Sequence, residues 1–177
     1  MIKSYYIEQH THLNEADINS NWSKKHFNIS DDNIIAFLGS FSPIELPTLP
    51  QSTKKADPKL FDFMLHFIVK HKRISFREAE TRRRLLIEFM KPLINPYCFT
   101  MDGHLLYKDK QINISKTVSN LRASLFHIGF FIQKTPNATH LVSLNDLKIN
   151  IKDFALQSMK RYCEDMHLIH NLSLNQA

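Results

Sequence analysis

The stretch from residue 102 to residue 133 constrains the fold of this chain more than any other. Two runs with strand-like patterning, 105–107 and 111–117, flank a tight polar turn at 108–110. A third apolar run follows at 125–133, with a histidine and a glycine set into it. Short runs of this kind, bounded by turn residues, are typical of strands. The stretch therefore predicts a half-buried sheet, one face of which can host a ligand.

Composition indicates a soluble globular protein. The chain has 177 residues, of which 43% are hydrophobic and 23% are charged, and this predicts a single domain over 1–177. Thirteen Phe indicate a bulky aromatic core, while three Gly leave little material for a phosphate-cradling loop. Cys98 and Cys163 are far apart, which favours a reduced, cytoplasmic protein. No run approaches the roughly 18 apolar residues of a membrane span.

Helices are predicted on both sides of the strand-rich stretch. Asp57-Pro58 is a helix-start signal, and apolar residues at helical spacing follow, which predicts a helix over 57–70. Ser75 and Glu78 form a candidate capping box at the start of a second helix that runs to about residue 93. A last helix is predicted over 148–172. Its apolar stripe has the clearest periodicity in the chain: Ala155, Met159, Tyr162, Met166 and Ile169.

The order of these elements predicts an α+β fold. Further strands are expected at 3–8, 33–38, 97–101 and 139–142, and a helix is expected over 14–27. Helices before and after a mostly antiparallel sheet should pack on one face of that sheet.

His127 stands out because its neighbours in sequence, Phe126 and Ile128, are apolar. A histidine in such a setting must have a polar partner or face a cavity, and a hydrogen-bonded structural histidine is the commoner case. Gly129 follows on the same strand face, where a missing side chain leaves room for a ligand or for packed backbone.

Basic residues cluster between residues 70 and 84. Arg82, Arg83 and Arg84 are consecutive, so on a helix they cannot all point at one ligand. Arg77 and Arg84 are seven apart and share a face, and with Lys72 they form a candidate anion-binding surface; a solvated face is the commoner reading. Ten histidines occur, but none has familiar ligand spacing, so no metal site is predicted.

Several blocks together resemble the domain-of-unknown-function 366 family. They occur in matching order and spacing at 19–39, 64–71, 83–87, 105–115, 126–129 and 144–155. The sheet of that family resembles the catalytic core of biotin and lipoate protein ligases, which activate a carboxylate as an acyl-adenylate. Those enzymes carry a Phe-His-His-Gly strand, which 126–129 matches as Phe-His-Ile-Gly.

The resemblance also implies which residues line the site. In the ligases a lysine follows a tight turn on a strand and contacts the acyl phosphate, and here that position holds Gln111. A glutamine donates a hydrogen bond but supplies no charge for the developing phosphate charge. The implied lining is His127, Gln111, Asn113 and Ser115, with Gly129 beside them.

Three hypotheses follow. The first is a small-ligand-binding domain with a ligase-like core, whose site for an acyl or nucleotide-type ligand is degenerate. The second is a basic module that binds RNA or another anion through Lys72, Arg77 and Arg84 without catalysis; the net charge of +6 permits it. The third is a structural or regulatory protein with no ligand. No motif names a cofactor, an oligomeric state or a substrate.

Overall fold

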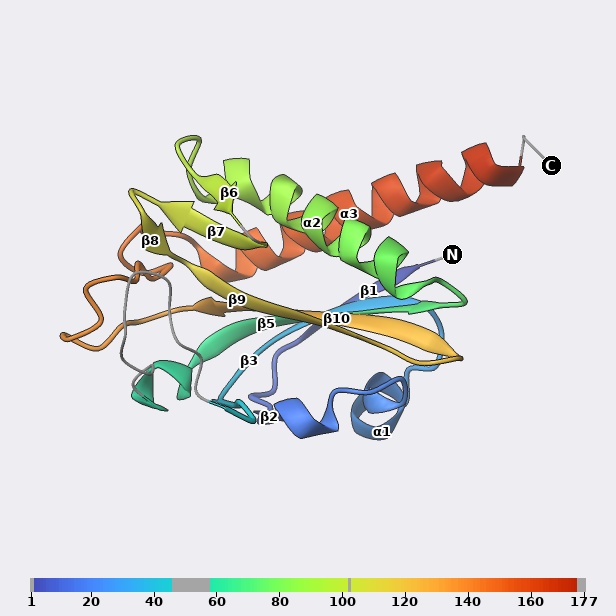
Figure 1. The fold of residues 1–177 in the computed structure, drawn as a ribbon, viewed down its shortest axis with the longest axis horizontal. Coiled ribbons are helices and arrows are strands. Elements are labelled where there is room, and N and C mark those ends of the chain that lie inside the picture. The colour runs from blue at the N-terminus through green and yellow to red at the C-terminus, as the bar shows by residue number, and fades with distance from the viewer. Residues whose placement is uncertain (1, 46–57, 102, 175–177) are drawn as a thin grey trace.

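The computed structural model describes residues 2–45, 58–101 and 103–174 (Figure 1). Its strands are β1 (Lys3–Ile7), β2 (Leu13–Asn14), β3 (Asn33–Gly39), β4 (Phe41–Ser42), β5 (Met64–Lys72), β6 (Phe99–Met101), β7 (His104–Tyr107), β8 (Lys110–Gln111), β9 (Asn113–Ser119) and β10 (Ala123–Phe131). Its helices are α1 (Trp22–Phe27), α2 (Phe76–Ile94) and α3 (Ile151–Leu174), with 3-10 turns at Glu15–Asp17 and Pro58–Phe61.

The main sheet has five strands in the order β1-β3-β5-β10-β9. Three of its four strand pairs are antiparallel, and β1 pairs with β3 in parallel. The predicted α+β class with a mostly antiparallel sheet is therefore confirmed, and the one parallel pair makes the sheet mixed.

The centre of this sheet is buried on both faces. Every residue of β10 and all but the last residue of β5 are buried, which explains why neither strand alternates apolar with polar residues. On one face lie α2 and α3 (Figure 1), packed on a cluster that includes Phe67, Phe126 and Tyr162. The other face carries α1 and the small β2–β4 pair, with Trp22 and Phe37 in its core.

A second sheet of three strands, β6-β7-β8, contains the predicted turn. Lys108 and Asp109 have left-handed φ values of 49° and 61°, and Tyr107 pairs directly with Lys110. Two consecutive left-handed residues make a two-residue hairpin loop whose twist matches that of the strands. The tight polar turn is thus confirmed.

Helix α2 begins as the sequence predicts. The Ser75 hydroxyl accepts a hydrogen bond from the Glu78 backbone N–H at 3.1 Å. The Glu78 side chain does not complete the capping box and instead pairs with Arg82 at 2.5 Å. The stripe on α3 is confirmed through Ala155, Met159, Tyr162 and Met166, which are buried, while Ile169 at its end is 40% exposed.

The helix predicted over 57–70 is wrong. Pro58–Phe61 forms one 3-10 turn, and Met64–Lys72 is the central strand β5. The predicted cap at Asp57 lies outside the described residues. A continuous apolar run is compatible both with a helix and with a strand that is buried on both faces. The segment forms a strand because it pairs with β3 and β10.

Two smaller predictions also need correction. The expected strand at 139–142 is only an isolated bridge from Leu141 to Gln111. The expected helix over 14–27 is a 3-10 turn followed, after a break, by the short helix α1. Asn19 causes that break locally, because its side chain accepts the Asn21 backbone N–H in an Asx-type turn.

Met159→Ala should lower the free energy of unfolding by about 2–4 kcal/mol, because it leaves a cavity in the core between α3 and the sheet. Urea unfolding of the purified variant measures this. Leu156→Ala, on the same helix but 42% exposed, is the matched control and should change stability much less. Equal effects of the two changes would show that the stripe does not face the core.

Candidate functional site

Two buried histidines form the polar centre of the sheet face that carries α1. His127 on β10 and His66 on β5 are 1% and 0% exposed, and His66 Nδ1 lies 3.0 Å from His127 Nε2. His66 Nε2 lies 3.2 Å from the Gly39 carbonyl oxygen. The expectation that His127 needs a polar partner in its apolar setting is met by a second histidine.

The hydrogen bonds fix the tautomers of this pair. A carbonyl only accepts, so His66 must carry its proton on Nε2 and donate it to Gly39. His66 Nδ1 is then an acceptor, and His127 donates to it from Nε2. Burial lowers the pKa of His66 to about 3 and holds the pKa of His127 well below its ordinary value. Both rings are therefore neutral near pH 7, and His127 Nδ1 is left as a hydrogen-bond acceptor.

The glycines beside the pair are closely packed. A Cβ built on Gly129 would lie 3.0 Å from the Met64 methyl group and 3.1 Å from the His127 ring, so those groups occupy the room that the sequence suggested for a ligand. A Cβ on Gly39 would lie 1.8 Å from the Thr11 carbonyl oxygen. Phe41 packs on His127 with ring centroids 5.1 Å apart. The pair is thus sealed by its neighbours.

The structure separates two of the expected lining residues from His127. In the β9–β10 register Asn113 is opposite Phe130 and Ser115 is opposite Ile128, and opposed residues share a face. Asn113 and Ser115 therefore point to the face covered by α2 and α3. Asn113 Oδ1 accepts the Leu105 backbone N–H at 2.7 Å, and Ser115 donates to the Gly103 carbonyl at 3.0 Å.

Gln111 lies on β8, outside the five-stranded sheet, and is 3% exposed. Its amide nitrogen lies 2.6 Å from the Asn113 carbonyl oxygen and 3.2 Å from His104 Nδ1. Both donors of the amide are thus engaged internally. Its Oε1 has no hydrogen-bond partner among the residues that the structure describes.

Lys116 lies beside His127, where the sequence analysis expected Asn113 and Ser115. It is the register partner of His127 on the edge strand β9, so the two side chains share a face. Its side chain is 47% exposed and forms an ion pair with Glu15. The next pair on this face, Val118 and Leu125, lines a cavity of about 210 Å³. Both strands were predicted from the sequence, but their register was not. Only the register shows that Lys116 is opposite His127.

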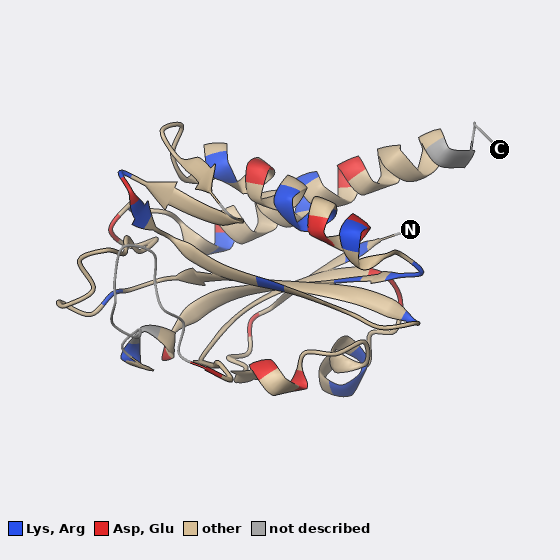
Figure 2. Cartoon of the chain, in the orientation of Figure 1, with Lys and Arg blue, Asp and Glu red and all other residues tan. Residues whose placement is uncertain are grey.

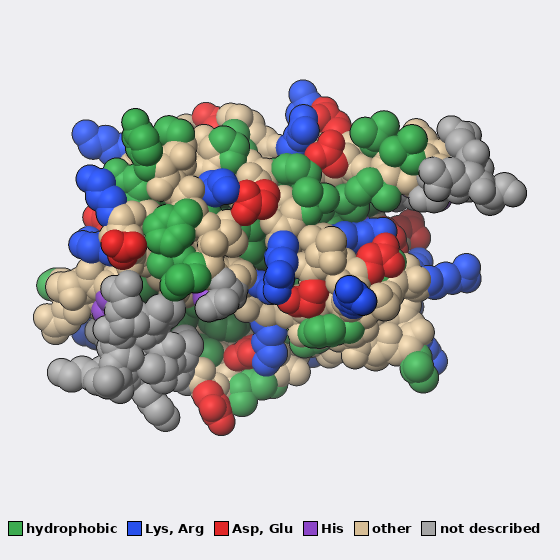
Figure 3. Space-filling view, turned by 45° about the horizontal axis from the view of Figure 1, so that its top comes forward, with side chains coloured by type: hydrophobic (Ala, Val, Ile, Leu, Met, Phe, Trp, Pro, Cys, Tyr) green, Lys and Arg blue, Asp and Glu red, His purple; other side chains and the backbone are tan. Residues whose placement is uncertain are grey.

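The alternative basic surface is dispersed. Lys72, at the end of β5, pairs with Asp31 at 3.4 Å, while Arg77 and Arg84 are exposed on α2. Arg83 is buried and binds Glu80 at 2.8 Å. Figure 2 shows basic and acidic residues interspersed along α2 and α3, and the face drawn in Figure 3 shows the same mixture on the surface.

The sequence profile named "Domain of unknown function (DUF366)" matches residues 2–174. The chain belongs to the DUF366 family. A comparison with curated protein sequences gives no significant match. Within the part of this DUF366 chain that the structure describes, no helix is both long and apolar enough to cross a membrane.

Solved structures with a similar fold include biotin and lipoate protein ligases. A protein of unknown function from Pyrococcus horikoshi is 19% identical, with a TM-score of 0.79 over 98% of this chain and 97% of that one. The biotin protein ligase from Aquifex aeolicus in complex with biotin and ATP is 10% identical, with a TM-score of 0.61 over 93% and 70%. Lipoate-protein ligase A bound with ATP is 7% identical, with a TM-score of 0.57 over 93% and 86%. At these identities the likeness establishes the fold alone.

The histidine pair should make the protein less stable in mild acid. In the unfolded chain each histidine takes up a proton below about pH 6.5, whereas in the folded protein burial resists protonation until the pH nears the lowered pKa, about 3 for His66. Stability is thus full above about pH 6.5 and falls as the pH falls, by up to roughly 1.4 kcal/mol per pH unit for each histidine.

Urea unfolding between about pH 7 and about pH 5 checks this. His127→Gln keeps a donor for His66 but cannot titrate, so its stability should fall less steeply with acid. His10→Gln, at an exposed position, is the control and should keep the slope of the unaltered protein. An unchanged slope in His127→Gln would contradict the assignment of His127 as a neutral buried base.

Proposed function

We propose that this protein binds a small acyl-type ligand on the sheet face that carries His127 and Lys116. The observation that carries the proposal is their pairing in register, because it places a cation next to a histidine at the edge of the sheet. A carboxylate can bind the Lys116 ammonium by a charge-assisted hydrogen bond. Lys116 is accessible to such a ligand, whereas His127 lies beneath Phe41 and supports the face from within.

The neighbouring cavity suits the apolar part of such a ligand. Its lining includes the apolar side chains of Ile18, Val118 and Leu125 and the polar residues Asn19 and Asn120. Its volume of about 210 Å³ is small compared with typical ligand sites of roughly 300–1,000 Å³, which favours a short chain or a single ring.

The same geometry argues against acyl-adenylate formation of the usual kind. The position where the resemblance expects a lysine holds Gln111, whose amide donors are used within the protein. A buried neutral amide supplies no fixed positive charge for a transition state that develops negative charge on phosphate. We therefore propose binding without adenylation, with Gln111, Asn113 and Ser115 supporting the strand that presents Lys116.

Calorimetric titration with octanoate, lipoate and biotin tests the binding. Lys116→Gln should weaken the best-bound acid by roughly 10- to 100-fold, since a hydrogen bond to a charged group contributes about 1.5–3 kcal/mol. Lys110→Gln, at an exposed lysine on β8, is the matched control and should bind as the unaltered protein does. Glu15→Gln removes the anion that competes for Lys116 and should strengthen binding.

Pyrophosphate exchange with ATP and the same acids tests the absence of adenylation. No exchange is expected, either from the unaltered protein or from Lys116→Gln. Robust exchange would contradict this proposal and indicate that the protein is an active ligase. Failure to bind any acid, together with tight RNA binding that weakens with salt, would favour the basic-module hypothesis.

A further inference from the structure

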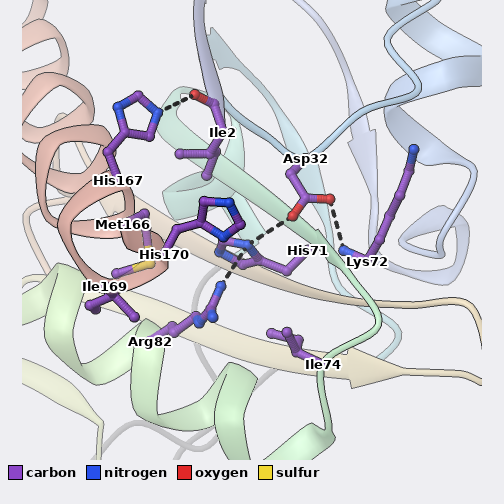
Figure 4. A pocket seen from close by; sticks show the side chains of 10 residues that line it. All are labelled: Ile2, Asp32, His71, Lys72, Ile74, Arg82, Met166, His167, Ile169 and His170. Carbon is purple, nitrogen blue, oxygen red and sulfur yellow. Dashed lines mark hydrogen bonds and ion pairs between the residues drawn. The ribbon is translucent and has the colours of Figure 1, made fainter. Parts of the chain in front are cut away.

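A separate cavity of about 310 Å³ lies at the far end of β5, between the start of α2 and the last turns of α3 (Figure 4). Its polar lining consists of Asp32, His71, Lys72, Arg82, His167 and His170. Neither His127 nor Lys116 contributes to it. It is thus distinct from the face that carries Lys116. Of the basic cluster between residues 70 and 84, Lys72 and Arg82 line it, whereas Arg77 and Arg84 do not.

A rigid, buried hydrogen-bond network forms the floor of this cavity. His71 is 1% exposed, and its Nε2 lies 2.6 Å from the Tyr162 hydroxyl. Arg82 donates to His71 Nδ1 at 2.9 Å, because a guanidinium can only donate. His71 Nε2 therefore carries the ring proton and donates it to Tyr162. The network holds the guanidinium of Arg82 among the residues that line the cavity (Figure 4).

Arg82 has hydrogen-bonding capacity to spare. A guanidinium has five N–H donors, and the described residues engage two of those of Arg82, one with His71 and one with Glu78. The other three donors have no partner among the described residues. His170 projects over the same space from α3 (Figure 4), and His167 is anchored by donating to the Ile2 carbonyl at 3.2 Å. The polar end of the cavity is therefore rich in donors.

The remaining walls and charges limit what can bind. Four lining residues are aliphatic or thioether side chains: Ile2, Ile74, Met166 and Ile169. Asp32, whose carboxylate lies 3.5 Å from His71 Nδ1, repels a second negative charge. Each lining cation already has an acidic partner, because Glu78 pairs with Arg82 and Asp31 pairs with Lys72. These charges disfavour a compact, strongly hydrated dianion. A ligand with one carboxylate and an apolar body suits both the polar and the apolar part of the lining.

We propose that this cavity is a second binding site, for a small monocarboxylate with a compact apolar body. The carboxylate accepts from the spare donors of Arg82 and from His170. The apolar body lies against Ile74, Met166 and Ile169. The site is independent of the Lys116 face, and ligand bound here would link β5, α2 and α3, which meet at this end of the sheet.

Benzoate is a suitable probe, with benzamide as its neutral counterpart and inorganic phosphate as a compact anion. Binding is followed by calorimetry and by the shifts of histidine side-chain resonances in NMR spectra. The titrations use the Lys116→Gln variant, so that binding at the Lys116 face does not contribute to the measured signal. Benzoate should bind, benzamide and phosphate should bind at least tenfold more weakly, and the resonances of His170 should shift while those of His127 do not.

Two pairs of variants localise the site. Arg82→Gln removes the charge, and Ile169→Trp fills the cavity while leaving Arg82 in place; each should weaken benzoate binding at least tenfold. Arg84→Gln and Leu168→Trp are matched changes at exposed positions that do not line the cavity, and they should leave binding unchanged. The proposal is overturned if benzoate does not bind, if phosphate binds more tightly, or if Ile169→Trp binds as Leu168→Trp does.

Discussion

The pairing of β5 with β10 is the constraint on which the rest of this structure depends. Nine residues of each strand face each other in register, and both faces of the pair are covered. Any buried polar side chain in these strands must then find a partner inside the protein, since a buried unpaired group costs about 1–3 kcal/mol. His66 and His127 satisfy each other on one face, and His71 finds Tyr162 and Arg82 on the other. Both candidate sites therefore include a buried histidine of the central strands, His127 at one and His71 at the other.

The fold was predictable wherever local chemistry decides the structure. The turn at Lys108 and Asp109, the cap at Ser75 and the stripe through Met159 each depend on residues close together in sequence. The error at β5 has a physical cause. A strand buried on both faces has no alternation to reveal it, and its apolar residues fit helical spacing as well. Only contacts with β3 and β10, distant in sequence, make this segment a strand.

The candidate site was less predictable because it depends on register. Asn113 and Ser115 share a strand face with each other, as period-two spacing requires, but not with His127. A shift of one residue between β9 and β10 would reverse this, and no local pattern fixes that shift. Lys116 was hidden for the same reason. The sequence could not distinguish Arg82 from the two arginines that follow it. In the structure Arg82 lines a cavity, Arg83 is buried and Arg84 is exposed to solvent.

Arg83 and Gly103 show how the two sheets are joined. Arg83 reaches from α2 to the Gly103 carbonyl at 3.4 Å, and a Cβ on Gly103 would lie 2.8 Å from its guanidinium. Gly103 also has a left-handed φ of 79°, which other residues rarely adopt. A side chain at 103 would strain the backbone and displace the Arg83 guanidinium, which is the flexible end of that side chain. That displacement would disturb the ion pair of Arg83 with Glu80, so substitutions at 80, 83 and 103 should be correlated among relatives.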